Sequence, residues 1–231
     1  MYFGGYGLYI LISLPALILG FYAQAKVKGA FNKYSKVRTS NGMTGAEVAR
    51  AVLDAKGLQD VQIQQVRGNL SDNYDPRTKV LNLSQSVYAT PSVAAAGVAA
   101  HEAGHAIQHA AGYGPLKLRS LMVPSVQLGS WLGPIVFMAG LLFNSDNMAL
   151  VGLVLFAVTA LFAVVTIPVE VDASKRAKEM LSTSGIVYQS EMAGVNKVLD
   201  AAALTYVAGA VQALSTLLYY VMLFSGGRRR N

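Results

Sequence analysis

The chain of 231 residues has no cysteine, only three histidines and few charged residues, which make up 13% of the sequence. Without cysteine it can form neither a disulfide framework nor a thiolate metal site, so any zinc must be bound by histidine, aspartate or glutamate. Soluble proteins carry about 25% charged residues, whereas here the hydrophobic fraction reaches 53%. The composition excludes an ordinary soluble domain and predicts a mainly α-helical integral membrane protein.

The charged residues that are present are unbalanced, with a formal net charge of +7. A basic protein can bind nucleic acid, but such proteins gather lysine and arginine on a soluble surface. Here the basic residues cluster beside apolar runs, where they set membrane orientation and contact anionic lipid. We therefore expect the lipid bilayer as a partner and exclude nucleic acid.

Four apolar runs are long enough to cross a bilayer, which takes about 20 helical residues. They comprise residues 6–25, 122–143, 148–167 and 201–224. No basic segment precedes the first run and no A-x-A cleavage site is evident, so we expect an anchor rather than a signal peptide. The sequence thus predicts a multi-pass protein with about four transmembrane helices.

The basic residues predict the orientation of these helices, because lysine and arginine accumulate in cytoplasmic segments. Five of them follow the first run at once, namely Lys26, Lys28, Lys33, Lys36 and Arg38. This cluster predicts an outside N-terminus, and three basic residues within 175–178 agree with it. Arg228, Arg229 and Arg230 oppose it, because four spans put them outside. We keep four spans, since the first cluster usually dominates; the alternative is that 201–224 lies only partly in the membrane.

Residues 26–120, between the first two runs, carry the signals of a cytoplasmic α+β domain. Thr44 and Glu47 form a capping box, which predicts a helix that ends near Gly57. A second, longer helix is expected to begin at Thr90-Pro91 as N-cap and first-turn proline and to end near Gly112.

A short sheet is expected between these two helices. Residues 61–66 mostly alternate between polar and apolar side chains, and residues 79–83 form a second strand-like segment. Asp75-Pro76 suits the first two positions of a turn between them.

The longer helix contains His101-Glu102-Ala103-Gly104-His105, an H-E-x-x-H motif. Residues four apart lie on one helix face, so His101 and His105 can bind the same ion. Glu102 lies beside that ion, where its carboxylate can accept a proton from metal-bound water. Chance matches to short motifs occur, but all three histidines fall within 101–109 and the alanine-rich flanks favour a helix. We therefore predict a zinc site with Glu102 as general base.

The third ligand is less evident. His109 lies eight residues after His101, roughly 12 Å along a straight helix, which is too far for one shared ion. The metzincin pattern overcomes this distance with a glycine break, but the spacing here differs. His109 is therefore expected to line the pocket, to support the ligands or to be merely polar.

A carboxylate from residues 168–200, expected to form a cytoplasmic helix, is the alternative. Glu170 emerges on the same side of the membrane as His101 in the predicted topology. An ordinary ion pair with Lys175 or Arg176 explains Glu170 equally well. Asp172 competes as a ligand, and Glu179 and Glu191 are weaker candidates.

The sequence resembles the YugP-type bacterial membrane zinc metallopeptidases. The resemblance rests on residues 101–108 together with 168–174, and it extends to Asn73-Tyr74-Asp75-Pro76-Arg77 and to residues 199–206. It thus covers nearly the whole chain. The architecture is also similar to the HtpX and Ste24 membrane proteases, which are gluzincins with a zincin-like domain.

The resemblance implies that Glu170 is the third ligand of one zinc ion per chain, in the plasma membrane of a bacterium. In the related proteases, an aspartate is expected four residues after this glutamate, at the position where this chain has Ser174. Asp172 and Asp200 are then the candidates to orient a ligand histidine through its other ring nitrogen.

Together these observations predict a zinc metalloendopeptidase that hydrolyses membrane-associated or unfolded proteins at the cytoplasmic face. We expect Lys79, Val80, Leu81, Asn82 and Leu83 to form an edge strand that binds an extended substrate. Tyr74, Tyr206 and His109 are candidates to stabilise the oxyanion. A glycine within a helix costs about 1 kcal/mol relative to alanine. Gly104 is therefore expected either to allow another backbone to approach closely or to be simply tolerated.

Two other functions remain open. A non-catalytic membrane scaffold would use a structural zinc closed by four protein ligands, with Asp172 or His109 as the fourth. A zinc hydrolase of lipids or of other amides would show no activity on peptides.

Overall fold

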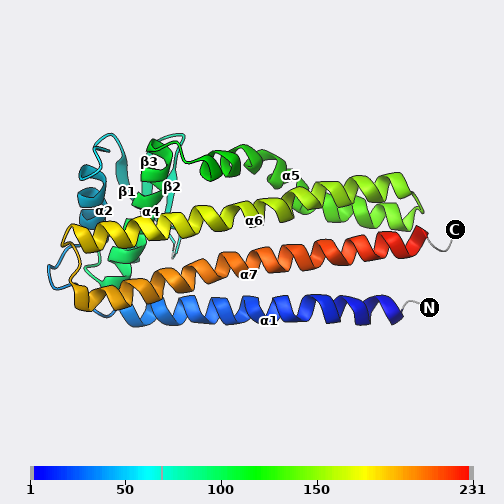
Figure 1. Cartoon of the computed structure of the whole chain (residues 1–231), viewed down its shortest axis with the longest axis horizontal. Helices are drawn as coiled ribbons and strands as arrows, with labels where there is room; N and C mark the ends of the chain where they lie inside the picture. Colours follow the sequence, from blue (N-terminus) through cyan, green and yellow to red (C-terminus); the bar gives the residue numbers. More distant parts are fainter. Residues whose placement is uncertain (1–2, 69, 229–231) are drawn as a thin grey trace. The chain divides into compact units, whose positions relative to one another are not determined.

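A computed structural model describes residues 3–68 and 70–228, and these are mainly helical (Figure 1). The helices are α1 Phe3–Tyr34, α2 Gly45–Asp54, α3 Gln85–Tyr88, α4 Val93–Ala110, α5 Gly114–Leu142, α6 Asp146–Thr183 and α7 Gln189–Arg228. The strands are β1 Gln62–Val66, β2 Asn73–Asp75 and β3 Val80–Ser84. The chain divides into two compact units, which are described separately below.

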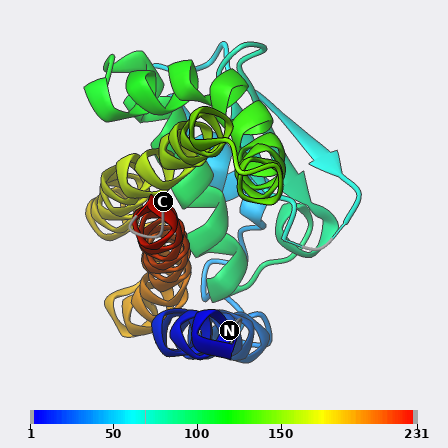
Figure 2. The same cartoon turned by 90° about the vertical axis from the view of Figure 1, so that its right-hand side faces the viewer.

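Among the described residues, the first unit contains 3–23, 117–168 and 205–228. Within it, α5 and the first part of α6 lie side by side and antiparallel (Figure 2). Gly140 and Gly152 allow this close approach, because a β-carbon at either position would collide with the facing backbone at Ala149 or Phe137. Phe137 in turn stacks on Tyr220 of α7, with ring centroids 4.5 Å apart.

Four helices among the described residues are long and apolar enough to cross a membrane. They cover Tyr9–Tyr34, Gly114–Leu142, Asp146–Thr183 and Gln189–Gly226. Each covers most or all of one expected apolar run and extends beyond it at one end or both, because helical propensity does not end where hydrophobicity does. The helix expected over 168–200 is divided between the end of α6 and the start of α7, with Gly185 at positive φ in the connection.

The second unit contains residues 24–116 and 169–204. The predicted capping box is present: the Thr44 hydroxyl accepts from the Glu47 backbone N–H, and the Glu47 carboxylate accepts from the Thr44 N–H. The helix that it begins, α2, buries Val48 and Val52 in a core that the alanines of α4 complete.

The three strands of this unit form a sheet with the order β1-β3-β2. β1 is parallel to β3 and β2 is antiparallel to it. Leu81 and Leu83 of β3 are fully buried, and Tyr74 of β2 lies opposite Leu81 on the same face. The expected strands at 61–66 and 79–83 are therefore confirmed to within one residue at each end.

The prediction that residues 79–83 form an edge strand was wrong. β3 occupies the centre of the sheet, and both of its edges are hydrogen-bonded to neighbouring strands. The sequence was misleading because β2 has only three residues, Asn73–Asp75, and its last residue is the first residue of the predicted turn. A strand of this length is too short to show an alternating pattern.

The helix that carries the H-E-x-x-H motif, α4, begins two residues later than expected. Ser92 rather than Thr90 is its N-cap, and the Ser92 hydroxyl accepts from the Ala95 backbone N–H at 3.2 Å. The helix ends at Ala110, and Gly112 follows with a φ of +64°, a conformation that glycine adopts without strain. The residues of α4 from Val93 to Gln108 are buried, except for the half-buried Val98.

Candidate metal centre

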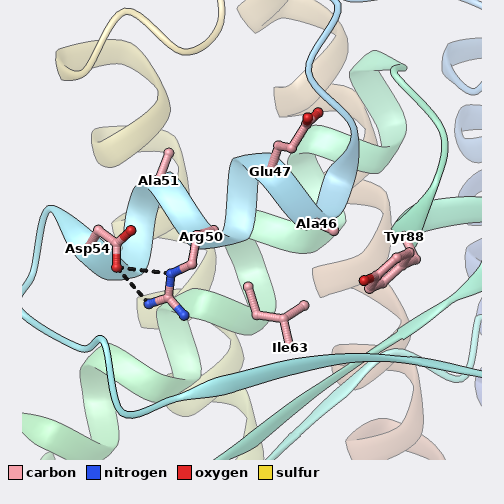
Figure 3. Close-up of a pocket in the computed structure, with 7 residues that line it drawn as sticks. All are labelled: Ala46, Glu47, Arg50, Ala51, Asp54, Ile63 and Tyr88. Carbon is pink, nitrogen blue, oxygen red and sulfur yellow. Dashed lines mark hydrogen bonds and ion pairs between the residues drawn. The ribbon is translucent and has the colours of Figure 1, made fainter.

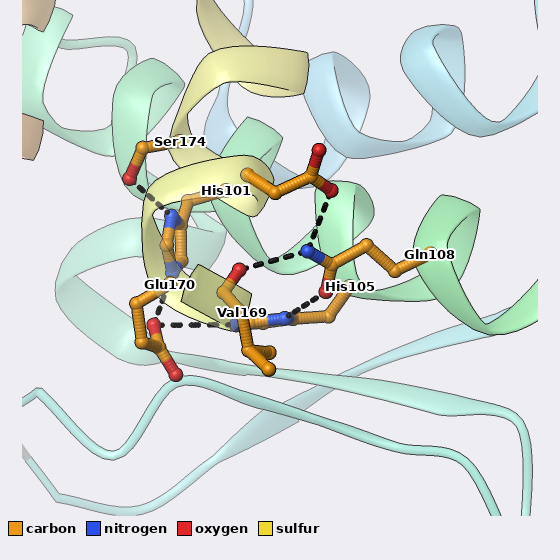
Figure 4. A network of polar contacts seen from close by, with 7 residues as sticks. His101, His105, Gln108, Val169, Glu170 and Ser174 are labelled. Carbon is orange, nitrogen blue, oxygen red and sulfur yellow. Dashed lines mark hydrogen bonds and ion pairs between the residues drawn. The ribbon is translucent and has the colours of Figure 1, made fainter. Parts of the chain in front are cut away.

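Three buried side chains converge in the second unit (Figure 4). His101 and His105 lie one turn apart on α4, and Glu170 lies on α6. The Glu170 Oε2 atom is 3.1 Å from His101 Nε2 and 3.5 Å from His105 Nε2. The donor atoms of all three residues lie within 4.8 Å of one another, and Glu170 is only 1% exposed. This group brings together the three residues predicted to bind zinc.

The spacing of these donor atoms fits a zinc ion. Zinc in proteins is usually tetrahedral with bonds of about 2.0–2.1 Å, so two of its ligand atoms lie roughly 3.3 Å apart. The two nitrogen–oxygen distances of 3.1 and 3.5 Å bracket this value. Two imidazoles and a carboxylate are also a ligand set of catalytic zinc sites, in which water takes the fourth position.

The other ring nitrogen of each histidine has a polar partner. His101 Nδ1 lies 3.0 Å from the Ser174 hydroxyl, and His105 Nδ1 lies 3.0 Å from Gln108 Oε1. Such contacts hold the ring and direct the Nε2 lone pair toward a metal. Ser174, at the position where the resemblance implies an aspartate, thus contacts His101.

The two acids proposed to orient the histidines lie elsewhere. Asp172 contacts Gln108 and Arg176 rather than a histidine. Asp200 is paired with Lys178 at 2.5 Å, and its side chain is 66% exposed. The expectation of direct carboxylate contact was wrong because Gln108 and Ser174 already occupy the two Nδ1 positions.

Gly104 explains how α6 comes so close to the motif. A β-carbon at this position would lie 2.7 Å from the Ala173 carbonyl oxygen, a distance that real β-carbons essentially never show. The glycine therefore permits close approach of the backbone that carries Glu170 and Ser174. Of the two explanations that the sequence left open for Gly104, the structure favours close approach.

Glu102 follows His101 and is buried, with 8% of its surface exposed. Burial raises the pKa of Glu102, while the neighbouring His105 and His101 act in the opposite direction. A carboxylate whose proton affinity is raised in this way is suited to accept and return a proton.

Tyr74 and His109 contact each other at the end of α4. The Tyr74 hydroxyl lies 2.9 Å from His109 Nδ1, so this contact connects β2 with the motif helix. Burial, aided by Asp60 and Asp75, raises the pKa of Tyr74 to about 12, and the phenol therefore stays protonated at neutral pH. Tyr206 lies on α7 in the first unit. The oxyanion role of all three side chains stays a prediction.

Sequence reasoning assigned no role to Gln108 and did not foresee that the Ser174 hydroxyl contacts His101. Both were detectable from helical spacing, because Gln108 is three residues after His105 and Ser174 is four residues after Glu170. Of the weaker ligand candidates, Glu191 accepts hydrogen bonds from the Ser40 backbone and hydroxyl and is absent from the convergent group.

A groove of about 490 Å³ lies elsewhere in this unit, between α2, β1 and α3 (Figure 3). It contains none of the predicted site residues. Its charged side chains are engaged, since Arg50 binds Asp54 and the carbonyl oxygens of Leu58 and Val61, and Glu47 belongs to the capping box. We therefore assign the groove no chemistry.

Two comparisons with known proteins bear on this geometry. Residues 9–225 match the protein family described as "Putative neutral zinc metallopeptidase". The chain is also 48% identical over 224 residues to the "Putative membrane protease YugP" of Bacillus subtilis (strain 168), which covers 97% of this chain and 100% of that protein. No solved structure matches this chain. The resemblance seen in the motifs is thereby confirmed, and the chain belongs to the family described as "Putative neutral zinc metallopeptidase".

Proposed function

We propose that the protein is a membrane-embedded, zinc-dependent metalloendopeptidase of the gluzincin type that hydrolyses unfolded or membrane-associated proteins at the cytoplasmic face. The observation that carries this proposal is the convergence of His101, His105 and Glu170, with Glu102 next to the first histidine. Three protein donors leave one position of a tetrahedral zinc ion for water, as in catalytic rather than structural sites.

In this proposal His101, His105 and Glu170 bind one zinc ion per chain. Zinc bound there lowers the pKa of a water molecule toward ~7 and polarises a carbonyl group. Glu102 accepts the proton of the attacking water and returns it to the amine nitrogen that leaves. Ser174 and Gln108 hold the histidine rings, so that the donor atoms are in position before zinc binds.

A substrate strand cannot pair with β3, so the free edges of the sheet belong to β1 and β2. β2 is the better candidate, because Tyr74 of this strand contacts His109 of the motif helix. An extended peptide that pairs with β2 would then run beside α4, and its backbone rather than its side chains would supply most of the hydrogen bonds.

The cytoplasmic orientation rests on the distribution of basic residues and on helix length. α6 has 38 residues and is thus roughly 57 Å long, whereas the hydrocarbon core is about 30 Å thick. Its apolar part, expected at 148–167, ends shortly before Glu170. The helix is therefore long enough to cross the bilayer and still carry Glu170 beyond it, on the side where Lys175, Arg176 and Lys178 follow.

The test is cleavage of an unfolded protein and of a mixed peptide pool by the zinc-loaded protein in detergent. We expect cleavage by the wild type and none by Glu102→Gln, which keeps the size of the side chain but removes the base. A chelator should abolish cleavage, and zinc should restore it. Equal activity of the two proteins would contradict the proposal, because the cleavage would then come from a contaminant.

The same experiment separates the two other functions. A scaffold with a structural zinc would bind metal but cleave nothing. Its fourth ligand would have to be Asp172 or His109, whose contacts with Gln108 and Tyr74 disfavour that role. Hydrolysis of lipids or of other amides without peptide cleavage would favour a hydrolase of another class.

A further inference from the structure

Gln108 is the fully buried amide beside the candidate metal centre. Its Oε1 atom lies 3.0 Å from His105 Nδ1. Its Nε2 atom donates to the Val169 carbonyl oxygen and to Asp172 Oδ2, each at 2.8 Å. Figure 4 shows the side chain between the motif helix and α6. The Gln108 amide thus contacts three groups: the proposed ligand His105, the backbone next to Glu170, and the carboxylate of Asp172.

These partners determine which way the amide points. The Val169 carbonyl is an acceptor only, and so is the ionised Asp172 carboxylate, which also accepts from Arg176 Nε at 2.6 Å. Reversing the amide would turn its oxygen toward two other oxygens. The Nε2 group of Gln108 must therefore face α6, and Oε1 must face His105.

The orientation of the amide in turn determines the tautomer of His105. Because Oε1 can only accept, the hydrogen on this contact belongs to His105 Nδ1. The lone pair of the neutral ring is then on Nε2, the atom that lies 3.5 Å from Glu170 Oε2. This tautomer is the one that can bind a metal through Nε2.

The same amide also restrains the helix that carries the third donor. Val169 directly precedes Glu170, and the hydrogen bond from Gln108 Nε2 to its carbonyl oxygen joins α6 to α4 at this point. Removing Gln108 would release the ring of His105 and the backbone of Glu170 together.

We propose that Gln108 is a positioning residue that fixes His105 as its Nδ1–H tautomer and aligns Glu170 with it, and that Asp172 sets the direction of the Gln108 amide. This inference rests on the proposed zinc site and extends it, because it assigns a function to two residues that do not contact the metal.

The experiment measures zinc affinity by competition with a coloured chelator, together with the visible absorption of the cobalt-substituted protein. The variants are Gln108→Met and Gln108→Glu, which are close to glutamine in size, and the double variant Gln108→Glu/Asp172→Asn. Gln212→Met is the matched control, because the Gln212 amide donates to the Thr216 hydroxyl one turn along the same helix and takes no part in the proposed metal centre.

Both single variants are expected to lower zinc affinity by about 10- to 100-fold, the usual effect of losing a residue that supports a metal ligand. The cobalt spectrum should change with them, while Gln212→Met should match the wild type. The double variant exchanges amide and carboxylate, so that an acceptor still faces His105 and the amide introduced at position 172 can donate to position 108. It should recover the part of the affinity that Gln108→Glu loses through repulsion by Asp172, whereas the hydrogen bond to the Val169 carbonyl oxygen is not restored.

Wild-type affinity and an unchanged spectrum in Gln108→Met would overturn the proposal, since a packing role alone needs only the volume of the side chain. A double variant as weak as Gln108→Glu would overturn the role of Asp172. If Gln108→Met does not fold, as judged by circular dichroism and gel filtration, the comparison of Gln108→Glu with the double variant decides. A wild type that binds neither zinc nor cobalt would instead refute the metal centre on which this inference rests.

Discussion

Gly104 of α4 lies directly against the backbone of Ala173 on α6. A β-carbon on Gly104 would lie 2.7 Å from the Ala173 carbonyl oxygen and 3.3 Å from the Ala173 Cα atom. Gly104 lies within the H-E-x-x-H motif, and Ala173 lies between the two α6 residues, Glu170 and Ser174, that contact the histidines. The motif glycine therefore determines how closely the third donor can approach.

Gly104→Ala should move the two helices apart. The clash should cost about 1–3 kcal/mol, more than the ~1 kcal/mol gained in helix propensity. We expect a lower melting temperature in detergent and a roughly tenfold loss of zinc affinity, since a tenfold change needs only about 1.4 kcal/mol. Gly29→Ala is the control, because a β-carbon there meets no atom within 4 Å. Equal effects of the two substitutions would contradict this explanation.

Ser174→Ala should weaken the hold on His101. It removes the hydroxyl 3.0 Å from Nδ1 and leaves the ring free to rotate. We expect zinc affinity to fall by about 10-fold or more, as measured by competition with a chelator. Ser182→Ala is the comparison on the same helix, because its exposed hydroxyl donates to the Glu179 carbonyl oxygen of the preceding turn. If Ser174→Ala kept wild-type affinity, its contact with His101 would have no bearing on the metal.

Removal of zinc should lower the thermal stability of the wild type but not that of Glu170→Gln. A ligand that binds only the folded state stabilises it by about 2.7 kcal/mol at a concentration 100 times its dissociation constant. We therefore expect a chelator to lower the melting temperature of the wild type and added zinc to restore it. In Glu170→Gln the neutral amide is a poor zinc ligand, and the shift should be small. A full zinc-dependent shift in this variant would argue against Glu170 as a ligand.

Tyr74→Phe should separate β2 from the end of α4. The substitution removes the hydroxyl that contacts His109 Nδ1 at 2.9 Å but keeps the ring. We expect a loss of about 1 kcal/mol in the free energy of unfolding, the usual contribution of one hydrogen bond. Zinc affinity should not change, because Tyr74 is not among the three convergent donors. A double-mutant cycle with His109→Phe measures the contact, and additive effects would show that the pair contributes nothing.

The proposed four-span topology puts both termini outside. Alkaline phosphatase, which is active only after export, should therefore be active when it is fused after Asn231. Alkaline phosphatase inserted between Lys36 and Arg38 should be inactive, because this basic cluster is expected in the cytoplasm. A cytoplasmic C-terminus would refute four full spans and favour partial insertion of residues 201–224.

Several features were predictable from the sequence because they depend on neighbours in the chain. His101 and His105 share a helix face by their spacing alone, and the capping box of Thr44 and Glu47 spans only three residues. The four apolar runs coincide almost entirely with long apolar helices for the same local reason. Glu170 is 65 residues from His105; the predicted topology made it one candidate, and only the resemblance to known proteases favoured it over the other acids.

Other features were decided by the tertiary structure. β3 is central because the three-residue strand β2 pairs with it, and no local pattern announces so short a strand. Asp200 is exposed and paired with Lys178, whereas Ser174 and Gln108 contact the histidines. Which polar group reaches a ring nitrogen depends on how two helices pack and on the close approach that Gly104 allows. The sequence alone therefore identified His101 and His105 as a candidate metal-binding pair and left several acids open as the third donor. The packing of α6 against α4 brought Glu170 to this pair and determined which residues hold the rings in place.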